Sequence, residues 1–282
     1  MNYRHSFHAG NFADVFKHAI FARVLSYLLQ KPSPLRVIDT HSGVGVYDLN
    51  GTDASRTGEW EKGIGLLRTL SFSTGMKTFL EPYLSTIASM NAPLGLMKFY
   101  PGSPELARRL LRSGDRLVLC ELHPEDATHL RWRYARDNQI KVCELDGWVG
   151  LNAFVPPKEK RGLVLIDPPF EKSGEFDRMH NALTGALRKW RNGVYLLWYP
   201  IKHHQEADAF AAHLADSGIG NLLRAELFVH PPTTSNRLNG CGLMIANPPW
   251  VLEAELRTLL PEMAQILGQS TADWRVSEIS SG

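Results

Sequence analysis

Short apolar segments recur along the chain, and each one stops at a polar or acidic residue. An apolar run of about four to eight residues is typical of a strand that is buried on both faces of a sheet. The segments that we expect to form strands are Leu35–Asp39, Leu117–Glu121, Ile140–Asp146, Leu163–Asp167, Val194–Tyr199, Leu222–Val229 and Leu243–Ala246.

Segments with helical periodicity separate several of these strands. Asn11, which together with Asp14 resembles a capping box, precedes apolar residues at helical spacing, and Lys31-Pro32-Ser33-Pro34 ends that helix. The alternation of strands and helices predicts an α/β protein whose sheet is mostly parallel and covered on both faces. Further helices are expected over Asp126–Asp137, Phe176–Arg191 and Leu252–Leu260.

The end of the chain departs from this alternation. The loop His230–Thr234 has no room for a crossover helix, so the last two strands are expected to form an antiparallel hairpin at one edge. Six parallel strands and one reversed edge strand make the Rossmann-like fold of S-adenosylmethionine-dependent methyltransferases, a seven-stranded variant of the doubly wound sheet. The polar tail Gln269–Gly282 is expected to be loose.

A small helical insertion is expected between the first two strands. The interval from Asp39 to Glu121 is much longer than one crossover needs, and the stretch Trp60–Met97 has helical patterning. We therefore divide the chain into an arm, helix and first strand (residues 1–45), a mostly helical insertion (46–100) and the remainder of the methyltransferase domain (101–282).

Composition narrows the class of protein without revealing its partner. The 282 residues are 44% hydrophobic and contain no apolar run long enough to span a membrane or resemble a signal peptide, so we expect a cytoplasmic monomer. The three cysteines are too far apart for a disulfide framework or a CxxC metal pair. A net charge of +2 does not indicate nucleic-acid binding by itself, although arginines cluster at 108–112 and 131–136.

Polar residues at the ends of three predicted strands suggest a nucleoside site. Asp39 opens a D-x-x-x-G-x-G turn in which Gly43 would let a ligand approach the backbone, although an ordinary structural turn is equally compatible. Glu121 could accept hydrogen bonds from both ribose hydroxyls, or be merely a solvated acid. Asp146, before Gly147, could accept the adenine amino group of the same cofactor, or simply initiate a turn.

The most specific motif is Asp167-Pro168-Pro169-Phe170, which directly follows a strand. The two prolines remove backbone donors, so Asp167 and the neighbouring carbonyls present only acceptors toward an incoming NH₂ group. Phe170 can stack on a base that has left its helix. A second motif, Asn247-Pro248-Pro249-Trp250, ends the reversed strand instead, and we expect the first to be the functional one.

The N-terminal segment is rich in aromatic and basic side chains. Tyr3 and His5, followed by Lys17 and His18, are expected to form an arm beside the active site. A metal site that also uses His8 and His41, or plain surface histidines, are alternative interpretations, but no H-E-x-x-H or similar ligand spacing accompanies them. We expect no metal.

Together these motifs resemble ribosomal RNA large subunit methyltransferase J, a bacterial family that makes N6-methyladenine in 23S ribosomal RNA. The resemblance covers nearly the whole chain and also includes Pro101-Gly102-Ser103-Pro104. It departs from the family at Phe170, where a tyrosine is familiar, and at Ser42 and Val44, where alanine is common. It implies a chain that transfers methyl groups from S-adenosylmethionine to an adenine N6 of 23S ribosomal RNA, with the base flipped into the D-P-P-F pocket.

The resemblance also implies roles for particular residues. Asp167, Pro168 and Phe170 are the expected catalytic residues, and Asp167 is also expected to accept the proton. Tyr3, His5 and Lys17 are expected to contact RNA. The expected cofactor-contacting residues are His18, His41, Gly43, Ser103, Glu121, Asp146, Gly147 and Asp167.

Three other functions remain as alternatives at this stage. A DNA adenine-N6 methyltransferase would use the same pocket but usually adds a target-recognition module, and no second domain is visible. A non-catalytic RNA-binding protein would explain the basic residues without needing the strand-end acids. A nicotinamide oxidoreductase would have a third glycine where Asp48 stands.

Overall fold

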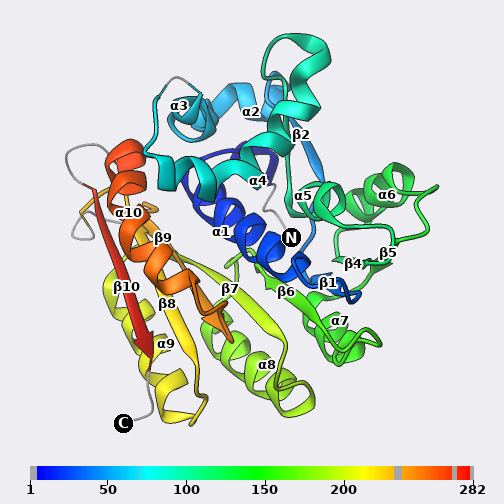
Figure 1. Cartoon of the computed structure of the whole chain (residues 1–282), viewed down its shortest axis with the longest axis vertical. Coiled ribbons are helices and arrows are strands. Elements are labelled where there is room, and N and C mark those ends of the chain that lie inside the picture. The colour runs from blue at the N-terminus through cyan, green and yellow to red at the C-terminus, as the bar shows by residue number, and fades with distance from the viewer. Residues whose placement is uncertain (1–4, 69, 232–236, 269–271, 280–282) are drawn as a thin grey trace.

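Within the described residues the strands form two sheets, and Figure 1 shows the larger one, which extends from β10 to β5. The computed structural model describes residues 5–68, 70–231, 237–268 and 272–279. The main sheet has eight strands in the order β10-β8-β9-β7-β6-β1-β4-β5, and β2 and β3 form a separate pair. The strands are β1 (Arg36–Asp39), β2 (Val46–Asp48), β3 (Phe99–Pro101), β4 (Arg116–Glu121), β5 (Ile140–Glu144), β6 (Gly162–Ile166), β7 (Val194–Ile201), β8 (Leu222–Phe228), β9 (Gly240–Ala246) and β10 (Asp273–Ile279).

Helices cover both faces of the main sheet. Side chains alternate between the two faces along each strand, so Val37 packs against one helical layer and its neighbour Ile38 against the other. The first layer contains α1 (Phe12–Leu29), α4 (Thr74–Asn91), α5 (Ser103–Leu110) and α10 (Leu252–Gly268), and the second contains α7 (Gly147–Phe154), α8 (Glu175–Lys189) and α9 (His204–Asp216). The remaining helices are η1 (His5–Phe7), α2 (Thr52–Thr57), η2 (Glu59–Lys62), α3 (Ile64–Leu67), η3 (Ala92–Leu94) and α6 (Pro124–Arg133).

The predicted α/β class and mostly parallel sheet are confirmed. Strands β5, β4, β1, β6 and β7 run parallel, and all seven predicted strands are present. The carboxyl ends of the parallel strands therefore meet at one edge of the sheet, where a doubly wound fold binds its ligands. None of the helices in the described ranges is long and apolar enough to cross a bilayer.

The edge of the sheet differs from the prediction. Asp273–Ile279 is an eighth strand that pairs antiparallel with β8, although the tail was expected to be loose. The reversed strand β9 consequently lies inside the sheet, between β7 and β8, and β10 is the edge. A strand at an edge is partly exposed and carries polar side chains, so β10 lacks the apolar run that marks the other strands.

Helix α1 is buried around its whole circumference. Its start is fixed by the Asn11 side chain, whose Oδ1 accepts hydrogen bonds from the amides of Ala13 and Asp14, each at 3.0 Å. Phe16 and Ile20 lie fully buried in the core, and the polar residues Lys17 and His18 are buried as well. A helix without a solvent-exposed face can thus bring polar side chains into the interior of the protein.

Mostly helical structure connects β2 to β3. Its longest helix, α4, packs on α1 and α10, and Phe79 and Tyr83 of α4 belong to the same buried core as α1. The 46–100 segment is therefore joined to the sheet by shared apolar packing. The interpretation of residues 46–100 as a separate subdomain, with boundaries after residues 45 and 100, stays a prediction.

Candidate active site

A cavity of about 650 Å³ opens at the carboxyl ends of the parallel strands. Its size lies within the range of about 300–1,000 Å³ that is usual for small-molecule sites. It is lined by residues from α1, from the turn after β1, and from the ends of β4, β6 and β7. The lining contains nearly all of the residues singled out in the sequence: His5, Lys17, His18, His41, Gly43, Ser103, Glu121, Asp146, Gly147, Asp167, Pro168 and Phe170. Tyr3 lies outside the described residues.

The turn after β1 requires glycine for a steric reason. Gly43 has φ +60°, and a Cβ there would lie 2.4 Å from the Tyr47 hydroxyl. The Gly43 amide donates a hydrogen bond of 2.8 Å to Glu121 at the end of β4. The turn is thus held against the neighbouring strand, with its backbone facing the cavity.

Two of the strand-end acids are also backbone acceptors. Glu121 is 8% exposed and accepts from the amides of Gly43 and His123, both at 2.8 Å, while burial raises its pKa. Asp146 Oδ1 caps α7 by accepting from the amides of Trp148 and Val149. Each carboxylate is oriented by these bonds and retains acceptor capacity toward the cavity.

His41 and Gly147 form a closely packed wall of the cavity. The His41 ring lies edge-on to Trp148, with 5.4 Å between ring centroids, and its Nδ1 is 2.8 Å from Thr40 Oγ1. Burial lowers the pKa of His41 to about 4, so its ring is neutral at pH 7. A Cβ on Gly147 would lie 2.2 Å from the Thr40 carbonyl oxygen and 2.8 Å from His41 Cε1. Only glycine fits at position 147 while His41 keeps its place.

A buried lysine lies between two carboxylates at the base of the cavity. Lys17 Nζ is 2.5 Å from Asp167 Oδ2 and 3.0 Å from Asp14 Oδ1, and its side chain is 5% exposed. Burial works to raise the pKa of Asp14, but its interactions with His5 and Lys17 outweigh burial and hold that pKa well below its ordinary value. The ammonium group therefore fixes the orientation of Asp167 relative to α1.

A second polar pair lies behind Asp167. Ser103 Oγ, at the start of α5, donates to Asp39 Oδ2 over 2.7 Å, and Asp39 is 1% exposed. Burial, assisted by the charge of Asp167, raises the pKa of Asp39 to about 7. Asp39 is therefore about half protonated at neutral pH.

His18 connects the cavity to the inserted helices. Its Nδ1 is 2.8 Å from the hydroxyl of Tyr100, which lies 3.0 Å from the hydroxyl of Tyr83 on α4. Burial lowers the pKa of His18 to about 3, so the ring is neutral. This chain of buried hydrogen bonds ties the cavity wall to α4.

The D-P-P-F segment leaves β6 with an unusual backbone. Phe170 has φ +50°, in the left-handed region that a bulky side chain rarely adopts. Its half-buried ring packs edge-on against Phe176 and Trp198, at centroid distances of 5.1 and 6.2 Å. The neighbouring aromatic rings therefore hold Phe170 beside Asp167 at the cavity.

The second proline motif lies elsewhere. Because β9 is antiparallel to β7, its carboxyl end lies at the amino end of β7, opposite the cavity. Asn247 follows it there, and its Nδ2 donates to the carbonyls of Arg191 and Gly193. Asn247 also has φ +55°, and Trp250 is 84% exposed. None of these residues lines the cavity.

The histidines considered for a metal site have separate partners. His5 bonds to Asp14 and His8 to Glu59, whereas His18 and His41 bond to hydroxyls. Within the part of the chain that the structure describes, no group of three or more His, Cys, Asp or Glu side chains is arranged to hold a metal ion.

Several residues of the site were not singled out by sequence reasoning. Asp14 was considered only as part of a helix cap, although its spacing to Lys17 and His18 places all three on one helical face. Trp198 is in the middle of β7, and Lys17 Nζ lies 5.7 Å from its ring centre. Nothing in the sequence around Trp198 distinguishes it from other strand residues.

Comparisons with known proteins agree on one family. A family model described as "Ribosomal RNA large subunit methyltransferase D, RlmJ" matches residues 32–280. The chain is 36% identical to ribosomal RNA large subunit methyltransferase J of Escherichia coli, over 99% of this chain and 100% of the relative. It is 37% identical to the Haemophilus influenzae protein of that name, over 99% of each. A crystal structure of a Legionella pneumophila protein is 34% identical, with a TM-score of 0.86, over 97% of this chain and 99% of that one.

Proposed function

The chain belongs to the ribosomal RNA large subunit methyltransferase J family, and we propose that it methylates the N6 amino group of an adenine in 23S ribosomal RNA. Methylation of ribosomal RNA with S-adenosylmethionine as the methyl donor follows from the family. The observation that supports the adenine N6 atom is the position of Asp167 and the two prolines after it, in a cavity that also contains the strand-end acids.

The cavity suits S-adenosylmethionine. Acidic side chains outnumber basic ones around the turn after β1, and a cofactor that carries a positive sulfonium is favoured by such surroundings. In the proposal, Glu121 accepts from the ribose hydroxyls and Asp146 from the adenine amino group of the cofactor. The neutral rings of His18 and His41, together with the backbone of Gly43 and Gly147, complete its site. When bound, the cofactor supplies an electrophilic methyl group.

Asp167 is the proposed partner of the target amine. Pro168 and Pro169 lack amide donors, so an NH₂ group that reaches this loop meets only acceptors. Accepting both amino hydrogens localises the nitrogen lone pair, which otherwise is delocalised into the purine ring. Formation of the N6–CH₃ bond would break the S–CH₃ bond of the sulfonium and leave a neutral thioether, and Asp167 would accept the proton that N6 loses while Lys17 keeps the carboxylate in place.

Phe170 supplies the stacking surface for the target base. Stacking on an aromatic ring contributes about 1–3 kcal/mol per base, which is comparable to the few kcal/mol that unstacking a nucleotide costs. The left-handed backbone of Phe170 and its packing on Trp198 fix the ring before the base arrives. A base flipped out of the RNA would therefore enter a preformed slot between Phe170 and the cofactor.

Methyl transfer to unmodified RNA tests the proposal. The protein is incubated with labelled S-adenosylmethionine and unmodified 23S ribosomal RNA, and the digested nucleosides are separated by mass spectrometry. We expect N6-methyladenosine as the labelled product and none on single-stranded DNA of the same sequence. A label on another nucleoside would contradict the N6 assignment, and a label on DNA alone would replace RNA as the substrate.

A further inference from the structure

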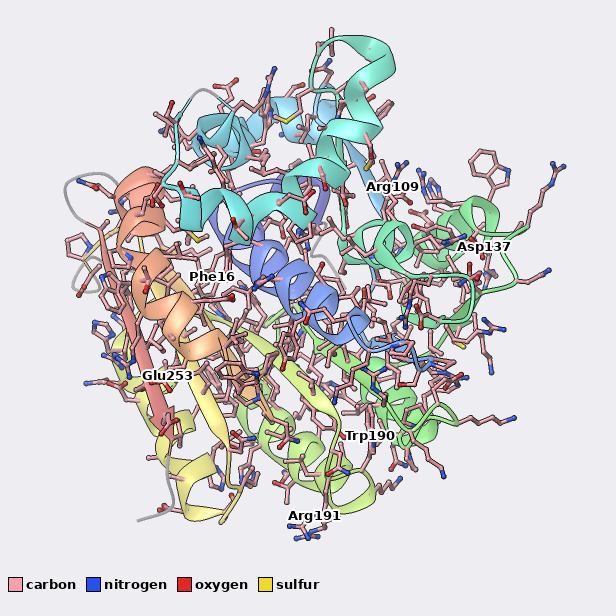
Figure 2. All side chains as sticks on the ribbon, viewed as in Figure 1. Phe16, Arg109, Asp137, Trp190, Arg191 and Glu253 are labelled. Atoms are coloured by element: carbon pink, nitrogen blue, oxygen red, sulfur yellow. The ribbon has the colours of Figure 1, made fainter. Side chains whose placement is uncertain are left out.

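A groove lined by arginines lies beside the cavity, between α5 and the end of α6. It is separate from the catalytic cavity, and Tyr134 and Glu105 join its two sides through a hydrogen bond of 2.9 Å. Figure 2 labels Arg109 and Asp137 on this side of the molecule. The lining consists of Glu105, Arg108, Arg109, Arg133, Tyr134, Arg136 and Asp137.

The groove carries uncompensated positive charge. Arg109 pairs with Glu105 at 2.6 Å, and Arg108 pairs with Asp137. Arg133 and Arg136 are exposed, and neither forms an ion pair with any residue that the structure describes. Four arginines against two acids leave two guanidinium groups facing solvent. Such groups bind phosphate oxygens with paired, charge-assisted hydrogen bonds.

The groove adjoins the site of methyl transfer. Helix α5 begins at Ser103, which lines the cavity, and α6 contains Asp126, which also lines it. A Cβ on Gly45, in the turn after β1, would lie 3.5 Å from Arg133 Cδ. From Asp126 to Arg133 the helix rises about 10 Å, at about 1.5 Å per residue. Arg133 and Arg136 thus lie close enough to the cavity for one RNA strand to contact both.

A large exposed aromatic side chain accompanies these arginines. Trp132 is 82% exposed and stands between Arg131 and Arg133 in the sequence. An unpaired base can stack on such a ring without regard to its identity. Exposed arginines and an exposed aromatic ring are the side chains with which proteins commonly bind single-stranded RNA.

We propose that Arg133 and Arg136 hold the RNA backbone next to the flipped adenine and that Trp132 stacks on a neighbouring base. This inference rests on the proposed function, because it names the surface on which the RNA substrate lies. The groove supplies affinity for RNA of any sequence, and the cavity selects the adenine.

Paired charge variants test the groove. The variant Arg133→Gln/Arg136→Gln is compared with Arg188→Gln/Arg191→Gln, which removes two exposed arginines from the other side of the protein, where Figure 2 labels Arg191. Affinity for unmodified 23S ribosomal RNA is measured between about 50 and 200 mM salt. The groove variant should make the negative slope of log affinity against log salt shallower by about 1.5, since each lost phosphate contact removes about 0.7–0.9 from its magnitude. Its calorimetric affinity for S-adenosylmethionine should stay that of the wild type.

The outcomes separate the groove from the proposed function. Equal slopes for both variants would contradict RNA binding by the groove, even if the wild type methylates RNA normally. If the groove variant alone loses RNA affinity while the wild type forms no N6-methyladenosine, the groove stands and the proposed N6 methylation fails.

A matched pair of tryptophans tests the stacking. Trp132→Ala and Trp250→Ala remove side chains that are 82% and 84% exposed; Trp132 is on α6 next to Arg133, whereas Trp250 follows the reversed strand β9, away from the carboxyl ends of the parallel strands. We expect Trp132→Ala to raise the KM for RNA about tenfold at unchanged kcat, and Trp250→Ala to leave both values unchanged. An equal effect of the two substitutions, or no effect of either, would contradict a stacking role for Trp132.

Discussion

Substituting Asp39 should change how the stability of the protein depends on pH. Its carboxyl group is 1% exposed and accepts from Ser103 Oγ at 2.7 Å and from the His41 amide at 3.3 Å. Those bonds favour the ionised form, but burial outweighs them and raises the pKa from 3.8 to about 7. Asp39→Asn replaces the group with a neutral one of the same shape.

The direction of this pH dependence follows from whether the folded or the unfolded state binds the Asp39 proton. Between about pH 4 and pH 7 the folded protein keeps the Asp39 proton, whereas the unfolded chain has lost it, so stability falls as the pH rises. At 1.36 kcal/mol per pKa unit, Asp39 costs the folded state about 4 kcal/mol at pH 8, where it is buried in the ionised form, and about 2 kcal/mol at pH 5, where it must hold a proton that the unfolded chain has lost. Asparagine avoids this cost but retains a single acceptor oxygen, so one of the two bonds that Asp39 accepts from the His41 amide and the Ser103 hydroxyl, worth about 1 kcal/mol, is lost or reversed in direction.

Urea denaturation of the wild type and Asp39→Asn at pH 5 and pH 8 measures the effect. The free energy of unfolding of the variant, relative to the wild type, should rise by about 2 kcal/mol between the two pH values. The neutral buried rings of His18 and His41 destabilise both proteins in acid and cancel in the difference. If the free energies of unfolding of the variant and the wild type differ by the same amount at pH 5 and pH 8, the pKa of Asp39 is not raised in the folded protein.

Further substitutions test the packing of Gly147 in the cavity wall and the stacking role of Phe170. Gly147→Ala places a Cβ 2.2 Å from the Thr40 carbonyl oxygen and should lower stability by about 1–3 kcal/mol and weaken cofactor binding, as measured by denaturation and calorimetry. Gly185→Ala, in α8 with nothing within 4 Å of the new Cβ, should instead stabilise the protein by about 0.5–1 kcal/mol. Phe170→Ala should raise the KM for RNA about tenfold, whereas Phe170→Tyr, which keeps the ring, should not. If Phe170→Tyr raised the KM for RNA as much as Phe170→Ala does, the loss of stacking would not be the cause.

The parallel part of the fold was predictable because its signals are local. Each central strand is a continuous apolar run that ends at Asp39, Glu121 or Asp167, and a parallel sheet places those ends at one edge. The order of the motifs along the chain was therefore enough to expect the residues of one cavity. It was also enough to separate Asp167 from Asn247, which lies at the opposite edge.

Other features depend on contacts that a sequence does not display. Strand β10 is polar because it lies at an edge, and only its pairing with β8 makes it a strand. The hairpin of β8 and β9 was expected, but not that β9 would lie between β8 and β7. The burial of Asp14 and Lys17 depends on the packing that surrounds α1 on all sides, which helical periodicity alone does not reveal.

The most direct test of the central claim is the rate of methyl transfer by Asp167→Ala on unmodified 23S ribosomal RNA. The variant should fold, because Lys17 retains Asp14 as a partner at 3.0 Å, and circular dichroism and calorimetric binding of S-adenosylmethionine would verify this. We expect kcat for formation of N6-methyladenosine to fall by about 10²–10⁴-fold, the usual contribution of a positioned proton acceptor. Turnover at the wild-type rate would contradict the role of Asp167 and, with it, the proposed chemistry of the cavity.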